Sequence, residues 1–295
     1  MRVYVIGGEG QVARALREAA AGRGDLVLGS SSRAEVDLLN TASIGRALDA
    51  FRPDVVINPA AYTAVDKAES EPEQAYAINR DGAGAVAAAA ARHSAPIIHF
   101  STDYVYDGRK PEAYVESDPV APQGVYGASK LAGERAVAAA NPKHVVLRTA
   151  WVYAPFGSNF VRTMLRLAAT HDRLRVVDDQ VGCPTYAPDI AGAVMAIAAS
   201  ISGRGWCPEH AGVTHLAGPD AVSWCGFARE IIRQSAGRGG RSVPVDPITT
   251  ADYPTPAARP ANSRLHTARL SEVFDIRLQS LETSLSNCLD RLLQS

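Results

Sequence analysis

Cysteine is scarce in this sequence, with four residues among 295, and the four lie far apart. Such spacing offers neither the disulfide framework of a small secreted protein nor the close ligand pairs that structural zinc sites use. We therefore expect a reduced, cytoplasmic protein with no structural metal. The cysteines are Cys183, Cys207, Cys225 and Cys288.

An excess of charge of one sign is also missing, since 31 acidic residues face 30 basic ones. This balance does not indicate a surface for nucleic acid or for an anionic membrane. The longest apolar stretch, residues 83–91, is mostly alanine and far shorter than the roughly 20 residues that cross a membrane. The sequence thus predicts no nucleic-acid partner and no membrane span, and it leaves monomer and homodimer open.

Short β-branched runs alternate with longer alanine-rich segments of helical period in the first half of the chain. This alternation is typical of parallel βαβ units. The runs are continuously apolar, which indicates helices on both faces of the sheet. The predicted fold class is α/β, a Rossmann-like doubly wound parallel sheet with a smaller, discontinuous C-terminal substrate-binding lobe. The expected strands lie at residues 3–6, 26–28, 55–57, 97–100 and 145–147.

The pattern changes after Arg148, where proline, loop signals and aromatic residues become more frequent. We expect a cofactor-binding domain over residues 1–150, rejoined by about 188–217, and a second lobe over residues 151–187 and 218–295. Five prolines within residues 243–264 predict an ordered loop over the cleft, because long loops in compact domains usually serve a function.

Residues 7–13 read Gly-Gly-Glu-Gly-Gln-Val-Ala and stand between the first expected strand and a helix. Glycine lets the backbone approach a pyrophosphate, whose charge the N–H groups of the helix N-terminus then meet. The motif can start at Gly7 or at Gly8, and both readings share Gly10 and Ala13. An ordinary glycine-bearing turn is the alternative, but the position at the first βα junction favours dinucleotide binding.

The dinucleotide fingerprint continues with an acidic residue about 20 positions on, which binds ribose hydroxyls. This chain instead has Gly-Ser-Ser-Ser-Arg at residues 29–33. Hydroxyls with a guanidinium suit a 2′-phosphate, because arginine offers forked donors to phosphate oxygens. The sequence therefore favours NADPH over NADH and makes Arg33 a candidate contact, although a solvated loop would have the same composition.

Tyr126 and Lys130 stand four residues apart in a segment of helical pattern, and so share one face of the helix. A nearby ammonium lowers the pKa of a tyrosine from about 10, which helps the phenol pass a proton to a carbonyl oxygen. Upstream, an apolar run ends at Ser101 and Thr102, where the ligand crevice of a doubly wound sheet lies. Thr102 is therefore expected to assist Tyr126. Such a Tyr-Lys spacing alone is more often a surface pair.

Several segments together resemble the extended short-chain dehydrogenase/reductases, and within them the dTDP-4-dehydrorhamnose reductase family. Residues 65–69 and 253–260 are the most specific, whereas many dehydrogenases share the glycine loop and the Tyr-Lys pair. The matching segments are residues 7–13, 58–69, 101–108, 126–134, 148–153, 179–185 and 253–260.

The resemblance implies that Tyr126 donates a proton, that Lys130 lowers its pKa and holds the nicotinamide ribose, and that Thr102 assists. It implies a lobe for a nucleotide sugar over residues 151–187 and 218–295. Besides Tyr126, Lys130, Gly7 and Arg33, cofactor contacts are expected at Gly10, Gln11, Val12, Ser30, Asp37, Leu38, Ala61, Tyr62 and Thr63. Substrate contacts are expected at Thr102, Asp103, Trp151, Asn159 and Arg259.

The implied reaction is NAD(P)H-dependent reduction of the 4-keto group of dTDP-4-dehydrorhamnose to dTDP-L-rhamnose, or of a closely related dTDP-4-keto-deoxysugar. Because a fold does not fix a function, two rivals stay open. One is a nucleotide-sugar epimerase or dehydratase of the same fold, which would retain and recycle its nicotinamide. The other is a non-catalytic NADP-binding regulatory protein, which would have no need of a tyrosine beside an ammonium.

Overall fold

A six-stranded parallel sheet forms the centre of the computed structural model, which describes residues 1–203 and 205–293. Its strand order is β10-β5-β4-β3-β1-β2, so the chain leaves β1 toward one edge and returns to build the other. This reversal places a crevice at the carboxyl ends of the central strands. The strands are β1 (Arg2–Ile6), β2 (Val27–Ser31), β3 (Val55–Asn58), β4 (Ile97–Thr102), β5 (His144–Thr149) and β10 (Gly212–His215).

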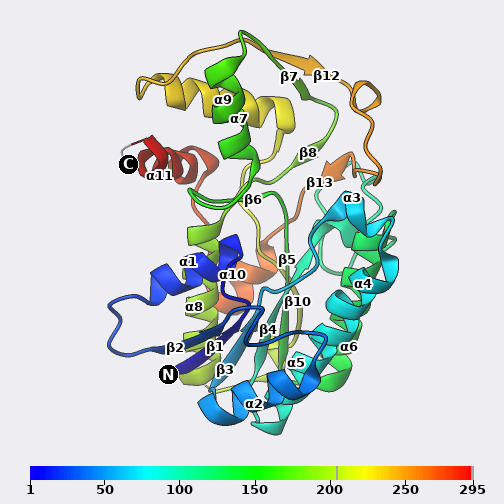
Figure 1. Ribbon diagram of the computed structural model, residues 1–295, viewed down its shortest axis with the longest axis vertical. Coiled ribbons are helices and arrows are strands. Elements are labelled where there is room, and N and C mark those ends of the chain that lie inside the picture. Colours follow the sequence, from blue (N-terminus) through cyan, green and yellow to red (C-terminus); the bar gives the residue numbers. More distant parts are fainter. Residues whose placement is uncertain (204, 294–295) are drawn as a thin grey trace.

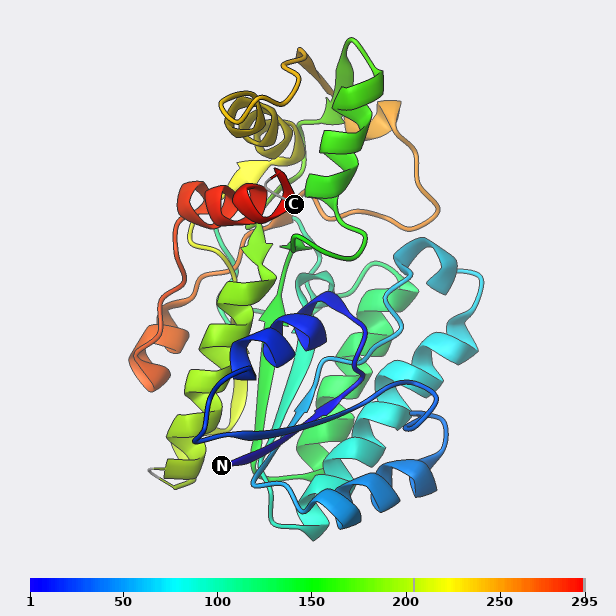
Figure 2. The same ribbon diagram turned by 60° about the vertical axis from the view of Figure 1, so that its left-hand side comes forward.

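Helices cover both faces of this sheet, which confirms the doubly wound fold (Figures 1 and 2). Helices α1 (Gln11–Ala20) and α8 (Ala187–Gly203) pack together on one face. The opposite face carries α2 (Thr41–Phe51), α5 (Ala83–Arg92) and α6 (Val125–Ala140). Among the described residues, no helix combines the length and the apolar character needed to span a membrane.

The central strands are buried along their whole length because both faces are covered. Every residue of β3 and β4 is buried. Alternate side chains point to opposite faces, so Ile57 and Ile98 pack toward α1 and α8, whereas Val56 and Ile97 pack toward α2 and α5. This double burial explains why the strands read as continuous apolar runs in the sequence.

A second hydrophobic core fills the upper part of the molecule in Figure 1, beyond the carboxyl ends of the strands. Its helices are α7 (Phe160–Thr170), α9 (Trp224–Ala236) and α11 (Leu281–Leu293). Here β7 (Leu174–Val177) pairs with β12 (Val245–Ile248), and β8 (Val181–Gly182) pairs with β11 (Val222–Ser223) and β13 (Asn262–Ser263). The proline-rich segment 243–264 thus contains β12, a 3-10 turn at Thr250–Asp252 and β13.

The chain passes between the two parts of the molecule more than once. After β6 (Val152–Tyr153) and β9 (Thr185–Tyr186), it returns through α8 to place β10 beside β5. A later helix, α10 (Ala268–Phe274), also packs against α8 and β10. Between β3 and α5 lie α3 (Val65–Ala68), α4 (Pro72–Tyr76) and a π-helix (Ala77–Gly82) that runs directly into α5.

Candidate active site

The glycine-rich turn after β1 forms a cradle at the crevice. Gly7 adopts a left-handed backbone with φ of 84°, and Gly10 caps α1 without any side-chain hydrogen bond. The N–H groups of the first turn of α1 therefore face the crevice without a capping side chain, as a bound phosphate requires. This arrangement fits the pyrophosphate of a dinucleotide.

A cavity of about 650 Å³ extends from this cradle to the catalytic residues expected from the sequence. Thr102, Tyr126 and Lys130 line it together, and so do Asp103 and Trp151. The structure therefore gathers both halves of the predicted site around one space. The expected cofactor residues that line the cavity besides Tyr126 and Lys130 are Gly7, Gly10, Gln11, Val12, Arg33, Asp37, Leu38, Ala61 and Thr63.

Four expected contact residues do not line this cavity. Ser30 is an exposed residue of β2, and the phenol of Tyr62 donates to Glu71 at 2.8 Å. Asn159 caps α7, and its amide donates to the Gln11 side chain at 2.8 Å. Arg259 donates to Asp66 at 2.6 Å, which joins the segment 253–260 to α3. Asn159 and Arg259 thus connect the second part of the molecule to the cofactor side.

Helix α6 carries the two groups of the Tyr-Lys pair, and local hydrogen bonds fix both. The Lys130 ammonium, only 2% exposed, donates to the Phe100 carbonyl oxygen of β4 at 2.6 Å. The Ser129 hydroxyl donates to the Tyr126 carbonyl oxygen at 2.8 Å. The ring of Tyr104 meets that of Tyr126 edge to face, with centroids 5.5 Å apart. The Tyr126 backbone is thus bonded to Ser129, and its ring packs against Tyr104.

Burial dominates the proton affinities of this site. It raises the pKa of Tyr126 to about 12, although a hydrogen bond with Thr102 lowers it. Burial lowers the pKa of Lys130 to about 8, against the charge of Glu134, which raises it. The lowering of the Tyr126 pKa that we expected from Lys130 does not occur here, because burial outweighs the other influences.

Asp103 is a buried carboxylate beside these groups. Thr102 donates to its Oδ1 at 3.1 Å, whereas Oδ2 has no hydrogen-bond partner among the residues that the structure describes. Burial raises the pKa of Asp103 to about 6, while hydrogen bonds from Ser263 and Thr102 lower it. A buried acceptor of this kind is suited to a ligand hydroxyl.

An ion pair lies one helical turn beyond Lys130. Arg148 of β5 forms two hydrogen bonds with Glu134, at 2.8 and 2.7 Å, and both side chains are almost completely buried. Ser101 donates to the same carboxylate at 2.5 Å. The pair ties α6 to β4 and β5 and keeps a negative charge near Lys130.

The side-chain amide of Asn79, in the π-helix, connects the cofactor loop to the catalytic helix. Its Oδ1 accepts from the Tyr62 backbone N–H at 2.8 Å, and its Nδ2 donates to the Tyr62 carbonyl oxygen at 3.1 Å. The same Nδ2 donates to Ser129 of α6 at 3.0 Å. Asn79 therefore holds the backbone of the cofactor loop at Tyr62. No local pattern indicates Asn79, since its partners lie 17 and 50 positions away along the chain.

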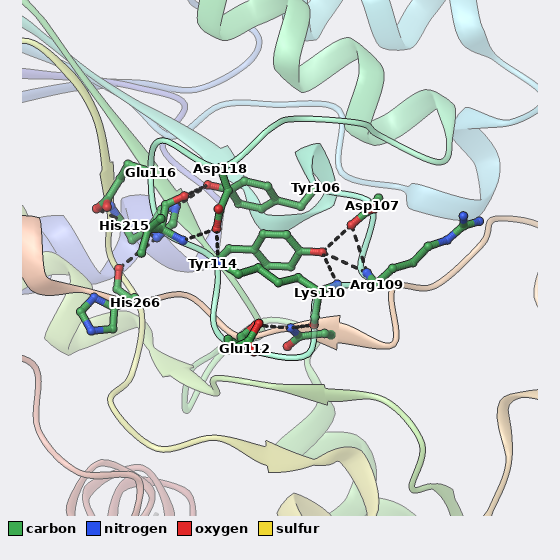
Figure 3. A network of polar contacts seen from close by, with 12 residues as sticks. Tyr106, Asp107, Arg109, Lys110, Glu112, Tyr114, Glu116, Asp118, His215 and His266 are labelled. Atoms are coloured by element: carbon green, nitrogen blue, oxygen red, sulfur yellow. Dashed lines mark hydrogen bonds and ion pairs between the residues drawn. The ribbon is translucent and has the colours of Figure 1, made fainter.

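The segment after Asp103 is anchored by the polar network in Figure 3. The rings of Tyr106 and Tyr114 stack with centroids 4.2 Å apart, and the Tyr114 hydroxyl donates to Asp107 at 2.5 Å. The Tyr106 hydroxyl lies 2.7 Å from Nε2 of His215 on β10. The chain that leaves the catalytic strand is thus fixed to the edge of the sheet.

The cavity is also lined by residues that sequence analysis did not place there, among them Tyr104, Thr149 and Trp224. Thr149 has a buried hydroxyl without a partner among the described residues, and it pairs in register with Thr102. Trp224 packs against the second hydrophobic core, and it also lines the cavity. Only the position of Thr149 at a strand end could have indicated a role.

Comparison with known proteins places this geometry in a family. Residues 1–294 match the family model described as the RmlD substrate binding domain. The dTDP-4-dehydrorhamnose reductase of Sinorhizobium fredii is 49% identical over 284 residues, which cover 96% of this chain and 95% of that relative. The chain belongs to the dTDP-4-dehydrorhamnose reductase family. The resemblance inferred from the sequence motifs is therefore confirmed.

Solved structures in the dTDP-4-dehydrorhamnose reductase family share the whole architecture. The reductase from Clostridium acetobutylicum is 38% identical with a TM-score of 0.91, and the alignment covers 100% of both chains. The reductase from Bacillus anthracis, described in complex with NADP, is 33% identical with a TM-score of 0.89 over 97% of both chains. The similarity to these solved structures therefore extends over nearly the full length of the chain.

Proposed function

We propose that this protein reduces the 4-keto group of dTDP-4-dehydrorhamnose to give dTDP-L-rhamnose, or acts on a closely related dTDP-4-keto-deoxysugar. The observation that carries the proposal is the meeting of Thr102, Tyr126 and Lys130 with the glycine cradle in one cavity. The expected class, an NAD(P)H-dependent oxidoreductase, agrees with the reductases to which the chain is related. NADPH is the favoured reductant, and NADH is the alternative.

The residues of the cavity fit a nicotinamide dinucleotide, which supplies a hydride when bound. The start of α1 with Gly10, Gln11 and Val12 would hold the pyrophosphate. Arg33 would bind the 2′-phosphate, with Ser30 beside it. Asp37 and Leu38 would contact the adenine side, residues 61–63 the middle of the cofactor, and Lys130 the nicotinamide ribose.

Tyr126 would protonate the oxygen of the sugar carbonyl. With its pKa raised to about 12 by burial, the phenol keeps its proton at neutral pH, as a proton donor must. The Thr102 hydroxyl, which donates to Asp103 in this structure, would turn to donate a second hydrogen bond to the same oxygen. Lys130 is charged below a pKa of about 8 and would stabilise the phenolate that proton transfer leaves behind.

The sugar nucleotide would lie between this wall and the second part of the molecule. Asp103, with a pKa of about 6, is mostly ionised at neutral pH and would accept a hydrogen bond from a sugar hydroxyl. Trp151 would contact the apolar side of the sugar. Asn159 and Arg259 would face the nucleotide, where a guanidinium suits the diphosphate.

We also propose how the chain is divided and where it works. Residues 1–150 with about 188–217 would form the NAD(P)-binding domain, and residues 151–187 and 218–295 the nucleotide-sugar lobe, except that α10 packs on the sheet side. The four cysteines are free thiols, which is consistent with the cytoplasm. The protein would act as a monomer or homodimer without a nucleic-acid or membrane partner.

The test is absorbance at the nicotinamide band when purified protein meets dTDP-4-dehydrorhamnose with NADPH or NADH. We expect oxidation by the wild type, formation of dTDP-L-rhamnose, and a loss of at least about a hundredfold in kcat for Tyr126→Phe. Cofactor that co-purifies and is regenerated without net consumption would point to an epimerase or dehydratase instead. Binding of NADPH without turnover of any keto sugar would point to a regulatory protein.

A further inference from the structure

Two tryptophan rings from distant parts of the chain stack at the cavity. The indoles of Trp151 and Trp224 are nearly parallel, with centroids 3.5 Å apart and an interplanar angle of 10°. Trp151 follows β5 of the central sheet, whereas Trp224 begins α9 in the upper part of Figure 1. Both line the cavity that holds Thr102 and Tyr126. The stack therefore joins the two parts of the molecule at the proposed substrate site.

The backbone of Trp151 is in a conformation that a bulky residue rarely adopts. Its φ is 49°, in the left-handed region. Such a conformation persists only when the surroundings impose it, and residues of this kind cluster at ligand sites. A hydrogen bond from the Thr185 N–H to the Trp151 carbonyl oxygen, at 3.1 Å, fixes the peptide on one side.

The indole of Trp151 is packed closely between other segments of the chain. A Cβ atom at Gly182 of β8 would collide with it, so only glycine leaves room there. Trp224 covers one face of the ring, and Phe160 packs behind Trp224 with centroids 4.6 Å apart. Trp151 therefore lies between the Trp224 ring and the backbone of β8, and only the part of the indole that lines the cavity is available to a substrate.

The register of the sheet places this indole near the reacting groups. Thr149 of β5 pairs with Thr102 of β4, and Trp151 follows Thr149 by two residues. A small displacement of the ring would therefore change how a sugar sits against Thr102 and Tyr126, and misplacement of about an ångström is enough to impair a reaction.

We infer that Trp224 is a positioning residue that fixes the Trp151 indole as the sugar-facing wall and thereby determines affinity for the nucleotide sugar. The inference rests on the proposed function for the identity of that ligand. Trp224 acts through Trp151, since the ring contacts of Trp224 among the described residues are with Trp151 and Phe160 and not with the glycine cradle.

The start of α9 does not depend on the Trp224 ring. The Ser223 hydroxyl caps the helix by accepting from the Gly226 N–H at 2.9 Å, and the Trp224 backbone N–H donates to the Gln180 carbonyl oxygen at 3.3 Å. Substitution of the ring therefore leaves the helix cap in place. Trp224→Phe keeps an aromatic plane against Trp151, whereas Trp224→Ala removes it.

The matched control is Trp206→Phe. The chain has three tryptophans, and Trp206 lines a separate hollow at the opposite end of the sheet, near Met1 and Pro96. Near-UV circular dichroism reports the stack, because the tryptophan bands depend on how the indoles are packed. We expect Trp206→Phe to keep the contribution of the stacked pair to the wild-type spectrum, and both Trp224 variants to lose it.

Affinity is measured by calorimetry on the NADP-saturated protein with dTDP-L-rhamnose as the probe, together with KM for the keto sugar. We expect Trp224→Ala to weaken both about tenfold, Trp224→Phe to restore most of the loss, and the Kd for NADPH to stay unchanged. An unchanged Kd for dTDP-L-rhamnose in Trp224→Ala would overturn the inference, as would an equal loss in Trp224→Phe and Trp224→Ala. A wild type that binds the probe but oxidises no NADPH would refute the proposed reaction and leave this comparison intact.

Discussion

The burial of Lys130 should make the protein less stable than it would be without this charge. Burial lowers the Lys130 pKa from an ordinary 10.5 to about 8, a drop that corresponds to about 3 kcal/mol of destabilisation of the folded state wherever both states are protonated. Removing the amine also removes its hydrogen bond to Phe100, worth ~1 kcal/mol. We therefore expect Lys130→Met to raise the free energy of unfolding by ~2 kcal/mol at neutral pH while it abolishes reduction.

The sign of the pH dependence follows from the same pKa. Between about pH 8 and 10.5 the unfolded chain binds more protons than the folded one, so this group makes the wild type more stable as pH rises. The advantage of Lys130→Met should shrink to nothing over that range in urea unfolding experiments. Lys143→Met is the control, since the Lys143 amine donates to the Ser94 carbonyl oxygen at the surface. The reasoning would be refuted if Lys130→Met were less stable than the wild type at pH 7. It would also be refuted if the difference in free energy of unfolding between the two proteins did not change with pH.

Two other substitutions test the surroundings of the site. Arg33→Ala should weaken NADPH binding about tenfold and leave NADH binding unchanged, because the lost contact is to the 2′-phosphate; a fluorescence titration that shows equal losses for both cofactors would contradict this role. Glu134→Gln should lower the free energy of unfolding by ~3–5 kcal/mol, because the buried charge of Arg148 loses its partner. A urea midpoint close to that of the wild type would count against the importance of this pair.

The parts of the site that could be predicted from the sequence depend on short-range rules. Strand, glycine turn and helix follow one another within residues 2–20, so the cradle is readable from local pattern. Tyr126 and Lys130 share a helix face because four residues make about one turn. Thr102 ends its strand where the crevice of a doubly wound sheet must lie.

The remaining parts depend on packing between distant segments. Trp224 reaches the cavity because the start of α9 lies against Trp151, which follows β5, and no local period indicates this contact. The pKa of Tyr126 is raised, whereas the Tyr-Lys spacing led us to expect a lowered pKa. The difference arises because burial depends on the whole folded molecule and cannot be read from that spacing. Arg259 pairs with Asp66, 193 positions away, which sequence spacing cannot foresee.

The late return of the chain to the sheet bears on how the protein folds. One face of β1, β3, β4 and β5 is covered by α8 and α10, which are synthesised after residue 186. A nascent chain of 150 residues would have only α1 on that face, and part of the apolar surface of β3, β4 and β5 would be exposed to water there. The first half of the sequence contains the cofactor motif, but the six-stranded sheet is completed only when β10, at Gly212–His215, has been made.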